Sequence, residues 1–267
     1  MSDKGRPILA AFQFLSRFPV KAELDFTPEL LRRSAKFYPL VGAAIGLVVG
    51  ALGIAANMVL PSLPSAVIML VVWVWLTGGL HLDGWMDSAD ALLSYRSREK
   101  MLEIMKDSRV GAMGVLACVL LLMFKVTLIS SLLDQGRLLV GIALLTAPVW
   151  SRWFMAWAMR VWPTARQGEG LAVRFHGITN RDIAISTAIS LLLSAIGMLA
   201  AYAWDGGAGS WQHLAVYFVL LPLISLGVGA LAANRMSTRL GGLTGDTYGA
   251  LNEGLEAILL LVALIIL

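Results

Sequence analysis

The chain has 267 residues, of which 58% are hydrophobic and only 14% charged, and its mean hydropathy is +0.77. Ordinary globular domains carry roughly 25% charged residues, so this composition excludes a soluble domain and indicates an integral membrane protein. The net charge of +4 is small, and no basic stretch interleaved with aromatic residues indicates a nucleic-acid partner. The one cysteine, Cys118, lies in an apolar run, which excludes an intrachain disulfide and a cysteine-based metal site.

The first 39 residues precede the first long apolar run and are polar or amphipathic. Ile8, Phe12 and Leu15 recur at helical spacing before Pro19, which predicts an amphipathic helix at the membrane interface. Seven apolar segments follow, and we expect one all-α catalytic domain, residues 1–267, folded as a polytopic transmembrane helical bundle. The predicted spans are residues 40–60, 65–80, 110–132, 138–159, 183–203, 214–233 and 251–267. The last is barely long enough to cross a bilayer, so six spans plus a re-entrant tail is the alternative.

The basic residues are distributed unevenly between the two ends of these spans. Of the 21 Lys and Arg residues, 18 fall in segments on the same side as the N-terminus. Because cytoplasmic segments are enriched in Lys and Arg, we expect the N-terminus in the cytoplasm. The polar stretches 81–90, 106–114, 165–176 and 239–253 all belong to that side. This placement predicts one active site at the cytoplasmic membrane surface, instead of a path through the bilayer.

Three aspartates, Asp83, Asp87 and Asp90, follow directly after the second apolar segment. On an α-helix, the rotation of about 100° per residue would place Asp87 about 40° to one side of Asp83 and Asp90 about 20° to the other. The three carboxylates would then share one face, within reach of one metal ion or of two close ones. The alternative is an acidic helix start, where Asp is favoured by the helix dipole. Since ionisable groups at the end of a membrane span are usually functional, we favour the metal site.

A second acidic pair lies before and within the last span, in the Gly-rich stretch 241–253. Asp246 and Glu253 are seven residues apart and would differ by about 20° around a helix. Together with the first three acids they are predicted to bind Mg²⁺, which prefers oxygen ligands and keeps open positions for substrate phosphates. The chain has only three His and one Cys, which argues against zinc. The alternative for 241–253 is a glycine-rich turn followed by a capped helix.

Cationic side chains on the same side are candidates for binding a phosphorylated substrate. Lys106 and Arg109 precede a Gly-x-x-Gly helix start, whose backbone N–H groups would complete an anion site; an ordinary basic flank is the alternative. Arg152 lies about two turns inside the fourth span and must either reach the surface or neutralise a negative group. Arg166 and Glu169 belong to a polar loop that we expect to fold over the ligand.

Two further ionisable residues allow more than one interpretation. His81 would point nearly opposite the acidic face of a helix. We expect it to bind substrate or to act as a general base, and the alternative is a packed structural histidine. Lys125 lies deep in the third span, where we expect a structural ion pair. A transporter or a membrane scaffold would need acids near mid-span, and we identify none there.

Six segments, in order along nearly the whole chain, resemble one family of membrane enzymes. They are Phe14-Leu-Ser-Arg-Phe-Pro19, Phe37-Tyr-Pro-Leu-Val-Gly42, Gly79-Leu-His-Leu-Asp-Gly84 with Asp87 and Asp90, Lys106-Asp-Ser-Arg-Val-Gly111, Ala165-Arg-Gln-Gly-Glu-Gly-Leu171 and Gly242-Leu-Thr-Gly-Asp-Thr-Tyr-Gly-Ala250. Together they resemble cobalamin synthase, a family also called adenosylcobinamide-GDP ribazoletransferase. Six matching segments are far more specific than any single motif.

The resemblance implies an Mg²⁺-dependent, multi-pass enzyme of the bacterial inner membrane, acting in the last steps of cobalamin nucleotide-loop assembly. It would join adenosylcobinamide-GDP to α-ribazole or its 5′-phosphate, giving adenosylcobalamin or its 5′-phosphate, and GMP. On this interpretation Mg²⁺ is held on the diphosphate by Asp83, Asp87, Asp90 and Asp246, and Glu253 is a further ligand or orients the nucleophile. The expected partners are the two substrates and membrane lipid, with self-association or contacts with other corrinoid-pathway proteins as further expectations. A lipid-directed, Mg²⁺-dependent phosphotransferase or prenyltransferase is the alternative.

Overall fold

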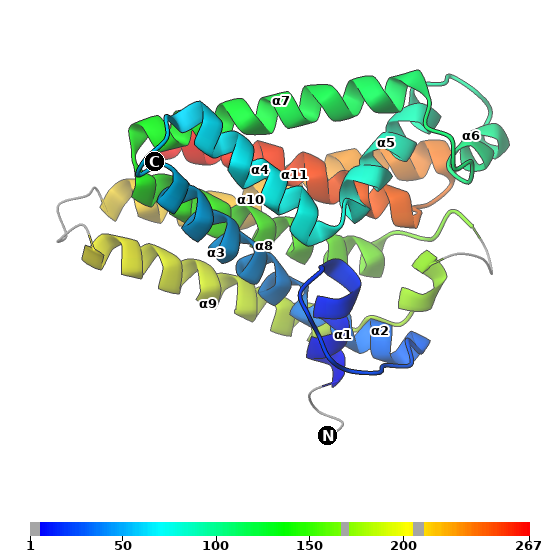
Figure 1. The fold of residues 1–267 in the computed structure, drawn as a ribbon. Helices are drawn as coiled ribbons and strands as arrows, with labels where there is room; N and C mark the ends of the chain where they lie inside the picture. Colours follow the sequence, from blue (N-terminus) through cyan, green and yellow to red (C-terminus); the bar gives the residue numbers. More distant parts are fainter. Residues whose placement is uncertain (1–5, 167–170, 205–210) are drawn as a thin grey trace.

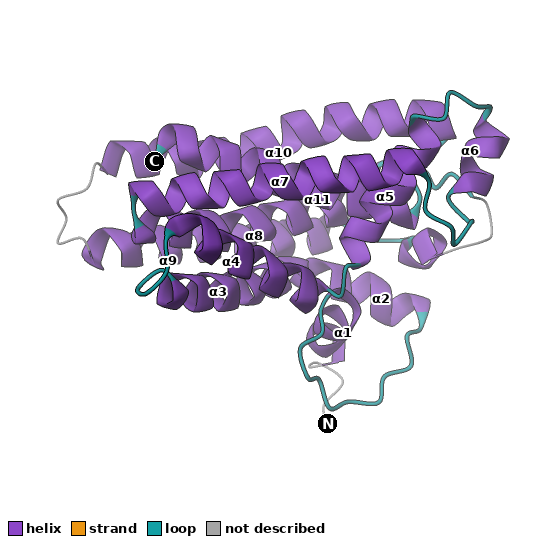
Figure 2. Ribbon diagram, turned by 45° about the horizontal axis from the view of Figure 1, so that its top comes forward, coloured by secondary structure: helices purple, strands orange, loops and turns teal. Residues whose placement is uncertain are grey.

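The structure is a computed structural model that describes residues 6–166, 171–204 and 211–267 (Figure 1, Figure 2). Within these residues the only β-pairing is a single bridge between Thr164 and Leu243, so the all-α prediction is confirmed. The α-helices are α1 (Arg6–Leu15), α2 (Pro28–Ser34), α3 (Tyr38–Ala56), α4 (Ser62–Thr77), α5 (Leu80–Leu92), α6 (Arg98–Ile104), α7 (Ala112–Gln135), α8 (Arg137–Val161), α9 (Asn180–Trp204), α10 (Trp211–Leu240) and α11 (Gly245–Ile266). Two short 3-10 helices, η1 (Ala35–Phe37) and η2 (Leu171–Phe175), complete the elements.

Six runs of helix in the described ranges are long and apolar enough to cross a membrane. They are Pro28–Ala56, which joins α2, η1 and α3, and the helices α7, α8, α9, α10 and α11. The helix α11 has 22 residues and passes this test by itself, which favours the predicted last span over its re-entrant alternative. The predicted second span, residues 65–80, corresponds to α4, which is shorter than these six runs. It counts as a seventh span only if α4 and α5, which are separated by a sharp bend, are taken together.

Two consecutive glycines break this second span. The helix α4 ends at Thr77, and α5 begins at Leu80 with a bend of 90° between them. Gly78 and Gly79 have φ values of 66° and 73°, in the left-handed region that glycine adopts without the steric cost of a Cβ atom. A Cβ on Gly78 would also lie 2.7 Å from Arg17 Nε. The glycines therefore turn the chain, so that the aspartate-bearing helix leaves the direction of α4 (Figure 1).

The helix α8 occupies the centre of the bundle, with 83% of its membrane-spanning stretch buried. The neighbouring helix α3 packs directly on its backbone, since a Cβ on Gly42 would collide with the Pro148 carbonyl and one on Gly46 with the Leu144 carbonyl. Pro148 has no N–H to donate to the Leu144 oxygen one turn earlier. Small residues let helices approach closely in a bilayer, where packing drives helix association. The glycines of α3 thus let its backbone lie directly against the backbone of α8 around Pro148.

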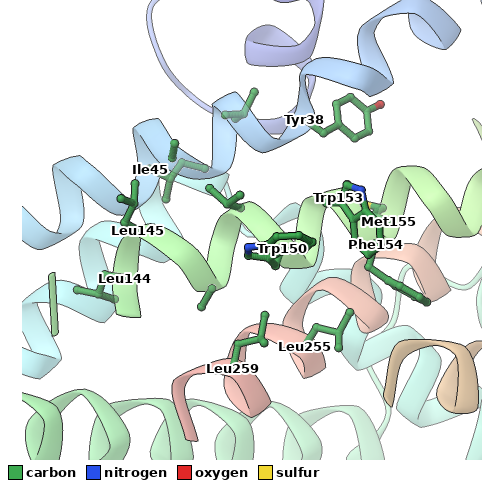
Figure 3. Packing of buried hydrophobic residues seen from close by; sticks show 14 of the residues in the cluster. Tyr38, Ile45, Leu144, Leu145, Trp150, Trp153, Phe154, Met155, Leu255 and Leu259 are labelled. Atoms are coloured by element: carbon green, nitrogen blue, oxygen red, sulfur yellow. The ribbon is translucent and has the colours of Figure 1, made fainter. Parts of the chain in front are cut away.

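Aromatic and aliphatic side chains fill the space around α8, with α3 on one side and α11, which carries Leu255, on the other (Figure 3). Trp150 is fully buried, and its indole N–H donates to Ser194 Oγ on α9 at 2.9 Å. Thr146 Oγ1 lies 2.9 Å from the Tyr217 hydroxyl oxygen on α10. Interhelical hydrogen bonds of this kind satisfy polar groups that lipid cannot. They connect α8 to both helices.

The polar segments that are predicted to form the active site lie at one end of the bundle. The helices α1, α2, α5 and α6 lie at this end, whereas the C-terminus lies at the other (Figure 1). The helix α1 is amphipathic, as predicted, but it ends at Leu15 and not at Pro19. Its apolar side faces protein, because Ala10, Ala11 and Leu15 are at most 1% exposed. The N-terminal helix is therefore part of the folded body at the end that carries the acidic residues.

Candidate active site

The aspartates of residues 81–90 lie on one helix, as the spacing predicts. Asp83 is exposed in the first turn of α5, and Asp87 is half-buried. The Asp87 carboxylate is repelled by three neighbouring carboxylates, those of Asp83, Asp90 and Asp246. Four acids therefore share one electrostatic neighbourhood, although Asp246 lies far away in the sequence. A cation offsets such repulsion most directly.

Asp90 has a structural role that its position in the sequence does not reveal. Its Oδ2 accepts a hydrogen bond from the Gly111 N–H at 2.7 Å, and its Oδ1 accepts one from the Gly114 N–H at 2.8 Å. These N–H groups belong to the start of α7, where the helix dipole favours negative charge. A Cβ on Gly111 would lie 2.5 Å from Asp90 Oδ1, so glycine leaves room for the carboxylate. The anion site predicted at 106–114 thus exists, and the protein's own Asp90 fills it.

The stretch 241–253 begins with the glycine-rich turn and the capped helix that its sequence allows. Gly241 and Gly242 have φ values of 72° and 143°. Thr244 then caps α11: its Oγ1 accepts the Thr247 N–H at 3.2 Å, and Thr247 Oγ1 accepts the Thr244 N–H at 2.8 Å. Asp246 follows in the first turn, where its Oδ2 lies 3.4 Å from Thr244 Oγ1. The cap fixes the position of the Asp246 backbone and still leaves its carboxylate partly exposed.

Glycines bring α5 and α11 into direct contact beside the acids. A Cβ on Gly84 of α5 would lie 2.6 Å from the Asp246 carbonyl oxygen. A Cβ on Gly249 of α11 would lie 3.0 Å from the His81 carbonyl oxygen. Any larger side chain at these two positions would push the helices apart. The two acidic segments are therefore held together by backbone contact.

A cavity of about 200 Å³ lies where α1, α5, α8, α11 and η2 meet. Besides Tyr248, four of the residues that line it are ionisable: His81, Asp83, Arg166 and Asp246. The aliphatic, Met and Phe side chains of its lining are Phe14, Leu15, Leu80, Met155, Met159, Ala172 and Phe175. The structure thus brings together four of the predicted site residues from three segments of the sequence. Of these segments, two are the acidic ones and one is the polar loop.

Arg166 reaches this cavity because its loop is tied to the turn before α11. The Ala165 N–H donates to the Leu243 carbonyl at 2.9 Å, beside the single β-bridge. The charge of Arg166 acts on Asp246, and its buried Nε has no hydrogen-bond partner among the described residues. A guanidinium with a free donor beside a carboxylate is suited to bind an anionic ligand. Glu169 of the same loop lies outside the described residues.

Lys106 and Arg109 lie on the exposed connection between α6 and α7. Arg109 Nε and Nη2 lie 3.0 and 2.7 Å from the two carboxylate oxygens of Asp107. These hydrogen bonds lower the pKa of Asp107 to about 2. The Arg109 side chain is 87% exposed, and neither basic residue is among the described residues that line the cavity. Arg109 is therefore paired with its own neighbour in this conformation.

A buried ionic network links α7, α8 and α11. Lys125 Nζ lies 2.5 Å from Glu253 Oε2 and 2.6 Å from Glu256 Oε2, and Arg152 Nη1 lies 2.7 Å from Glu256 Oε1. All four side chains are at most 7% exposed, and their formal charges cancel. The structural ion pair expected for Lys125 is confirmed. Arg152 neutralises an acid within the bundle, which is one of its two predicted alternatives.

This network engages two residues that were predicted to bind metal or substrate. The carboxylate of Glu253 pairs with Lys125, and the guanidinium of Arg152 with Glu256; neither Glu253 nor Arg152 is among the described residues that line the cavity. Glu256 itself is absent from the predicted site, and the expectation that no acid lies near mid-span is wrong. The sequence contained a sign of its role. Glu256 is an ionisable residue within a span and follows Glu253 by three positions, so both acids lie on the same face of the helix.

His81 lies between the cavity and this network. Its side chain is 2% exposed, and neither ring nitrogen has a hydrogen-bond partner among the described residues. Arg152, Glu256 and Lys125 all act on it electrostatically, and it lines the cavity. Buried polar nitrogens without partners are rare in folded proteins and call for an explanation. His81 therefore remains a candidate site residue, because it lines the same cavity as Asp83 although the two lie on nearly opposite faces of the helix.

The acids do not form a ready-made cage for a metal. Within the described ranges, no three Asp, Glu, His or Cys side chains are grouped so that they could hold an ion together. Asp90 accepts two backbone N–H groups, and Glu253 belongs to the buried network. The remaining candidates for metal binding are Asp83, Asp87 and Asp246.

Replacing Asp90 by Ala is expected to destabilise the protein, because the Gly111 and Gly114 N–H groups would lose a charged acceptor. We expect the free energy of unfolding, measured in detergent, to fall by about 1–3 kcal/mol. Asp83→Ala is the matched control, since Asp83 is exposed on the same helix, and its stability should stay within about 0.5 kcal/mol of the wild type. An Asp90→Ala protein as stable as the wild type would contradict the capping role.

Lys125→Met is expected to lower the free energy of unfolding by about 3–5 kcal/mol, since Glu253 and Glu256 would lose their shared cation in a buried place. The double variant Lys125→Met/Glu253→Gln restores neutrality and should lose less than the two single variants together. Lys100→Met is the control: its ion pair with Glu103 is exposed and should contribute less than about 1 kcal/mol. Equal losses for Lys125→Met and Lys100→Met would show that the network is not a stabilising constraint.

Comparison with known proteins supports the family that the six sequence segments resemble. A family model described as Cobalamin-5-phosphate synthase matches residues 7–264. Relatives named adenosylcobinamide-GDP ribazoletransferase are 38% identical: that of Brevibacillus brevis over 254 residues (95% of this chain, 96% of the relative), that of Desulfitobacterium hafniense over 261 (96% and 95%) and that of Pseudomonas fluorescens over 263 (97% and 99%).

No solved structure gives a significant match to the chain. The family and the names of the relatives give no support to a lipid-directed phosphotransferase or prenyltransferase. The family match covers the acidic segments, the polar loop and the membrane-length helices described above, except for the last two residues of α11. The chain belongs to the cobalamin-5-phosphate synthase family.

Proposed function

We propose that the protein joins adenosylcobinamide-GDP to α-ribazole, or its 5′-phosphate, giving adenosylcobalamin, or its 5′-phosphate, and GMP. This is the activity in the names of relatives that match the chain over almost its whole length. The observation that carries the proposal is that Asp83 and Asp246, from two separate helices, line one cavity with Arg166. Carboxylates beside a guanidinium provide the charges that a phosphoryl transfer requires.

The proposed cofactor is Mg²⁺, which Asp83, Asp87 and Asp246 would hold. Their oxygen atoms are the hard ligands that this ion prefers. One or two carboxylates suffice, because Mg²⁺ keeps several waters and binds substrate phosphates; such a site needs no preformed group of three acids, and the described residues contain none. When bound, the ion would neutralise non-bridging phosphate oxygens and the charge of the leaving phosphate.

The proposed reaction exchanges one phosphorus–oxygen bond for another. A ribose hydroxyl oxygen forms a bond to the phosphorus on the cobinamide side of the diphosphate. The bond from that phosphorus to the bridging oxygen breaks, and GMP leaves with the electron pair. The hydroxyl proton passes to a carboxylate of the acidic set. Arg166, whose charge acts on Asp246, would offset charge on the phosphates.

We place this site at the cytoplasmic face of the bacterial inner membrane. The multi-pass architecture follows from the six membrane-length helices. Among the residues that the structure describes, the end of the bundle that carries α1, α2, α5 and α6 is also the end of the segments that hold 17 of the 20 basic residues (Figure 1). Such an excess of Lys and Arg is typical of the cytoplasmic side, and it supports this orientation.

Purified protein incubated with adenosylcobinamide-GDP, α-ribazole and Mg²⁺ should release GMP, and a chelator should stop the release. Asp83→Asn and Asp246→Asn should each lower kcat at least about a hundredfold, because they remove charge that stabilises the transferred phosphoryl group. Glu103→Gln changes an exposed acid at the same end of the bundle and should keep full activity. No GMP above the chelator control would overturn the proposed function. Near-normal turnover by Asp83→Asn would overturn the site assignment alone.

Reporter fusions test the proposed orientation. A reporter placed after Tyr95, between α5 and α6, should be active only as a cytoplasmic fusion. One placed after Gly136, between α7 and α8, should be active only on the periplasmic side. Fluorescent-protein and alkaline-phosphatase fusions at each position give opposite signals and control for expression. A periplasmic signal at Tyr95 would contradict the orientation.

A further inference from the structure

The cavity has two chemically different walls. The helices α5 and α11 supply His81, Asp83 and Asp246, and Arg166 lies with them. By contrast, every described lining residue from α1, α8 and η2 is apolar. This apolar wall consists of Phe14, Leu15, Met155, Met159, Ala172 and Phe175. A ligand that fills the cavity must therefore have an apolar side and a polar side.

The apolar wall contains both a fixed and an adaptable part. The rings of Phe14 and Phe175 lie 5.7 Å apart, and Phe175 also lies 6.4 Å from the ring of Tyr38 in the core. Phe175 is only 2% exposed, so its packing holds this part of the wall in place. Met155 and Met159 add flexible thioethers, which make favourable contacts with aromatic rings. This combination suits a flat apolar ligand.

The volume of the cavity limits its occupant. Pockets for drug-sized ligands measure roughly 300–1,000 Å³, so a cavity of about 200 Å³ can enclose only one part of a corrinoid, a nucleotide or a nucleoside. An apolar cavity of about 150 Å³ holds a benzene ring. The available space therefore corresponds to one base of two fused rings.

The two proposed substrates carry three such bases: guanine, adenine and the dimethylbenzimidazole of α-ribazole. Guanine and adenine have N–H and acceptor groups on their edges, which would be unpaired against the apolar wall, and burial of unpaired polar groups is costly. The dimethylbenzimidazole ring, once joined to ribose, has one acceptor nitrogen and two methyl groups. Among the three, its surface matches the apolar wall.

We infer that this cavity binds α-ribazole, with its base on the apolar wall and its ribose directed toward Asp83, Asp246 and His81. This inference rests on the proposed function and deepens it, because it assigns one substrate to a defined set of residues. It also explains His81: a ribose hydroxyl would supply a hydrogen-bond partner to a ring nitrogen that has none among the described residues. Discrimination between acceptor bases then depends on the apolar wall.

The substitution Ala172→Leu tests the inference, because it fills part of the cavity from the apolar wall. In the GMP-release assay it should raise the KM for α-ribazole at least about tenfold and change the KM for adenosylcobinamide-GDP less than about twofold. Equilibrium dialysis of α-ribazole, without the second substrate, should show the same loss of affinity. Val173→Leu is the matched control, since Val173 is the next residue and is not among the described lining residues.

A second variant, Met159→Ala, tests the inference even if Ala172→Leu does not fold. The wild type should prefer α-ribazole about tenfold in kcat/KM over the ribonucleoside of unmethylated benzimidazole, because two buried methyl groups contribute about that factor. Met159→Ala removes a wall contact and should reduce this preference to less than about threefold. An unchanged preference would overturn the inference.

The remaining outcomes separate the inference from the proposed function. A folded Ala172→Leu protein that binds α-ribazole like the wild type would overturn the inference. The inference would also be overturned if Ala172→Leu raised only the KM for adenosylcobinamide-GDP. Binding of α-ribazole that Ala172→Leu weakens, without GMP release by the wild type, would support the cavity assignment and overturn the proposed function.

Discussion

The ionic network inside the bundle is the interaction that constrains the rest of the structure. Separating one member would leave an isolated charge in an apolar medium, so the helices that carry the four side chains must keep one register. Lys125 of α7 and Arg152 of α8 both bind Glu256 of α11. Lys125 Nζ also lies 4.8 Å from the centre of the Trp73 ring on α4. Four helices are thereby aligned at one depth.

This alignment determines where the acids of the candidate active site lie. Asp246 and Glu256 belong to the same helix, and at 1.5 Å per residue they are about 15 Å apart along its axis. Fixing Glu256 at the middle of α11 therefore fixes Asp246 at its end. There the helix packs on α5 through Gly84 and Gly249, with His81 at the contact. The charge-neutral network at the middle of α11 and the candidate site at its end thus belong to one rigid element.

The architecture was predictable from the sequence where the signal was local. Long apolar runs gave the spanning helices, and the spacing of Asp83, Asp87 and Asp90 gave their helix. The break before this helix was also visible as Gly78-Gly79, but a pair of glycines does not tell whether a span ends or bends. That choice depends on tertiary contacts such as the one between Gly78 and Arg17, which are distant in sequence.

The pairing of charged residues could not be predicted for the same reason. The sequence shows Lys125 and Arg152 as ionisable groups within spans, but not the acid that each would bind. The choice is made by the packing of α7, α8 and α11, which places Glu256 between both cations. Likewise, the start of α7 was identified as an anion site, and only the fold shows that Asp90 fills it. Spacing tells which side chains share a face, whereas packing decides what they bind.

The three aspartates of α5 therefore differ in role although they share one helix face. Asp90 attaches the end of α5 to the start of α7, and the glycine turn packed against Arg17 fixes its beginning. Asp83 and Asp87 lie between these two attachment points, so their backbone is held on both sides. Carboxylates that are positioned before the substrate binds need little reorganisation during phosphoryl transfer, and such preorganisation contributes strongly to catalysis. In the proposed reaction, Asp90, which caps a neighbouring helix, would thus contribute by fixing the positions of Asp83 and Asp87.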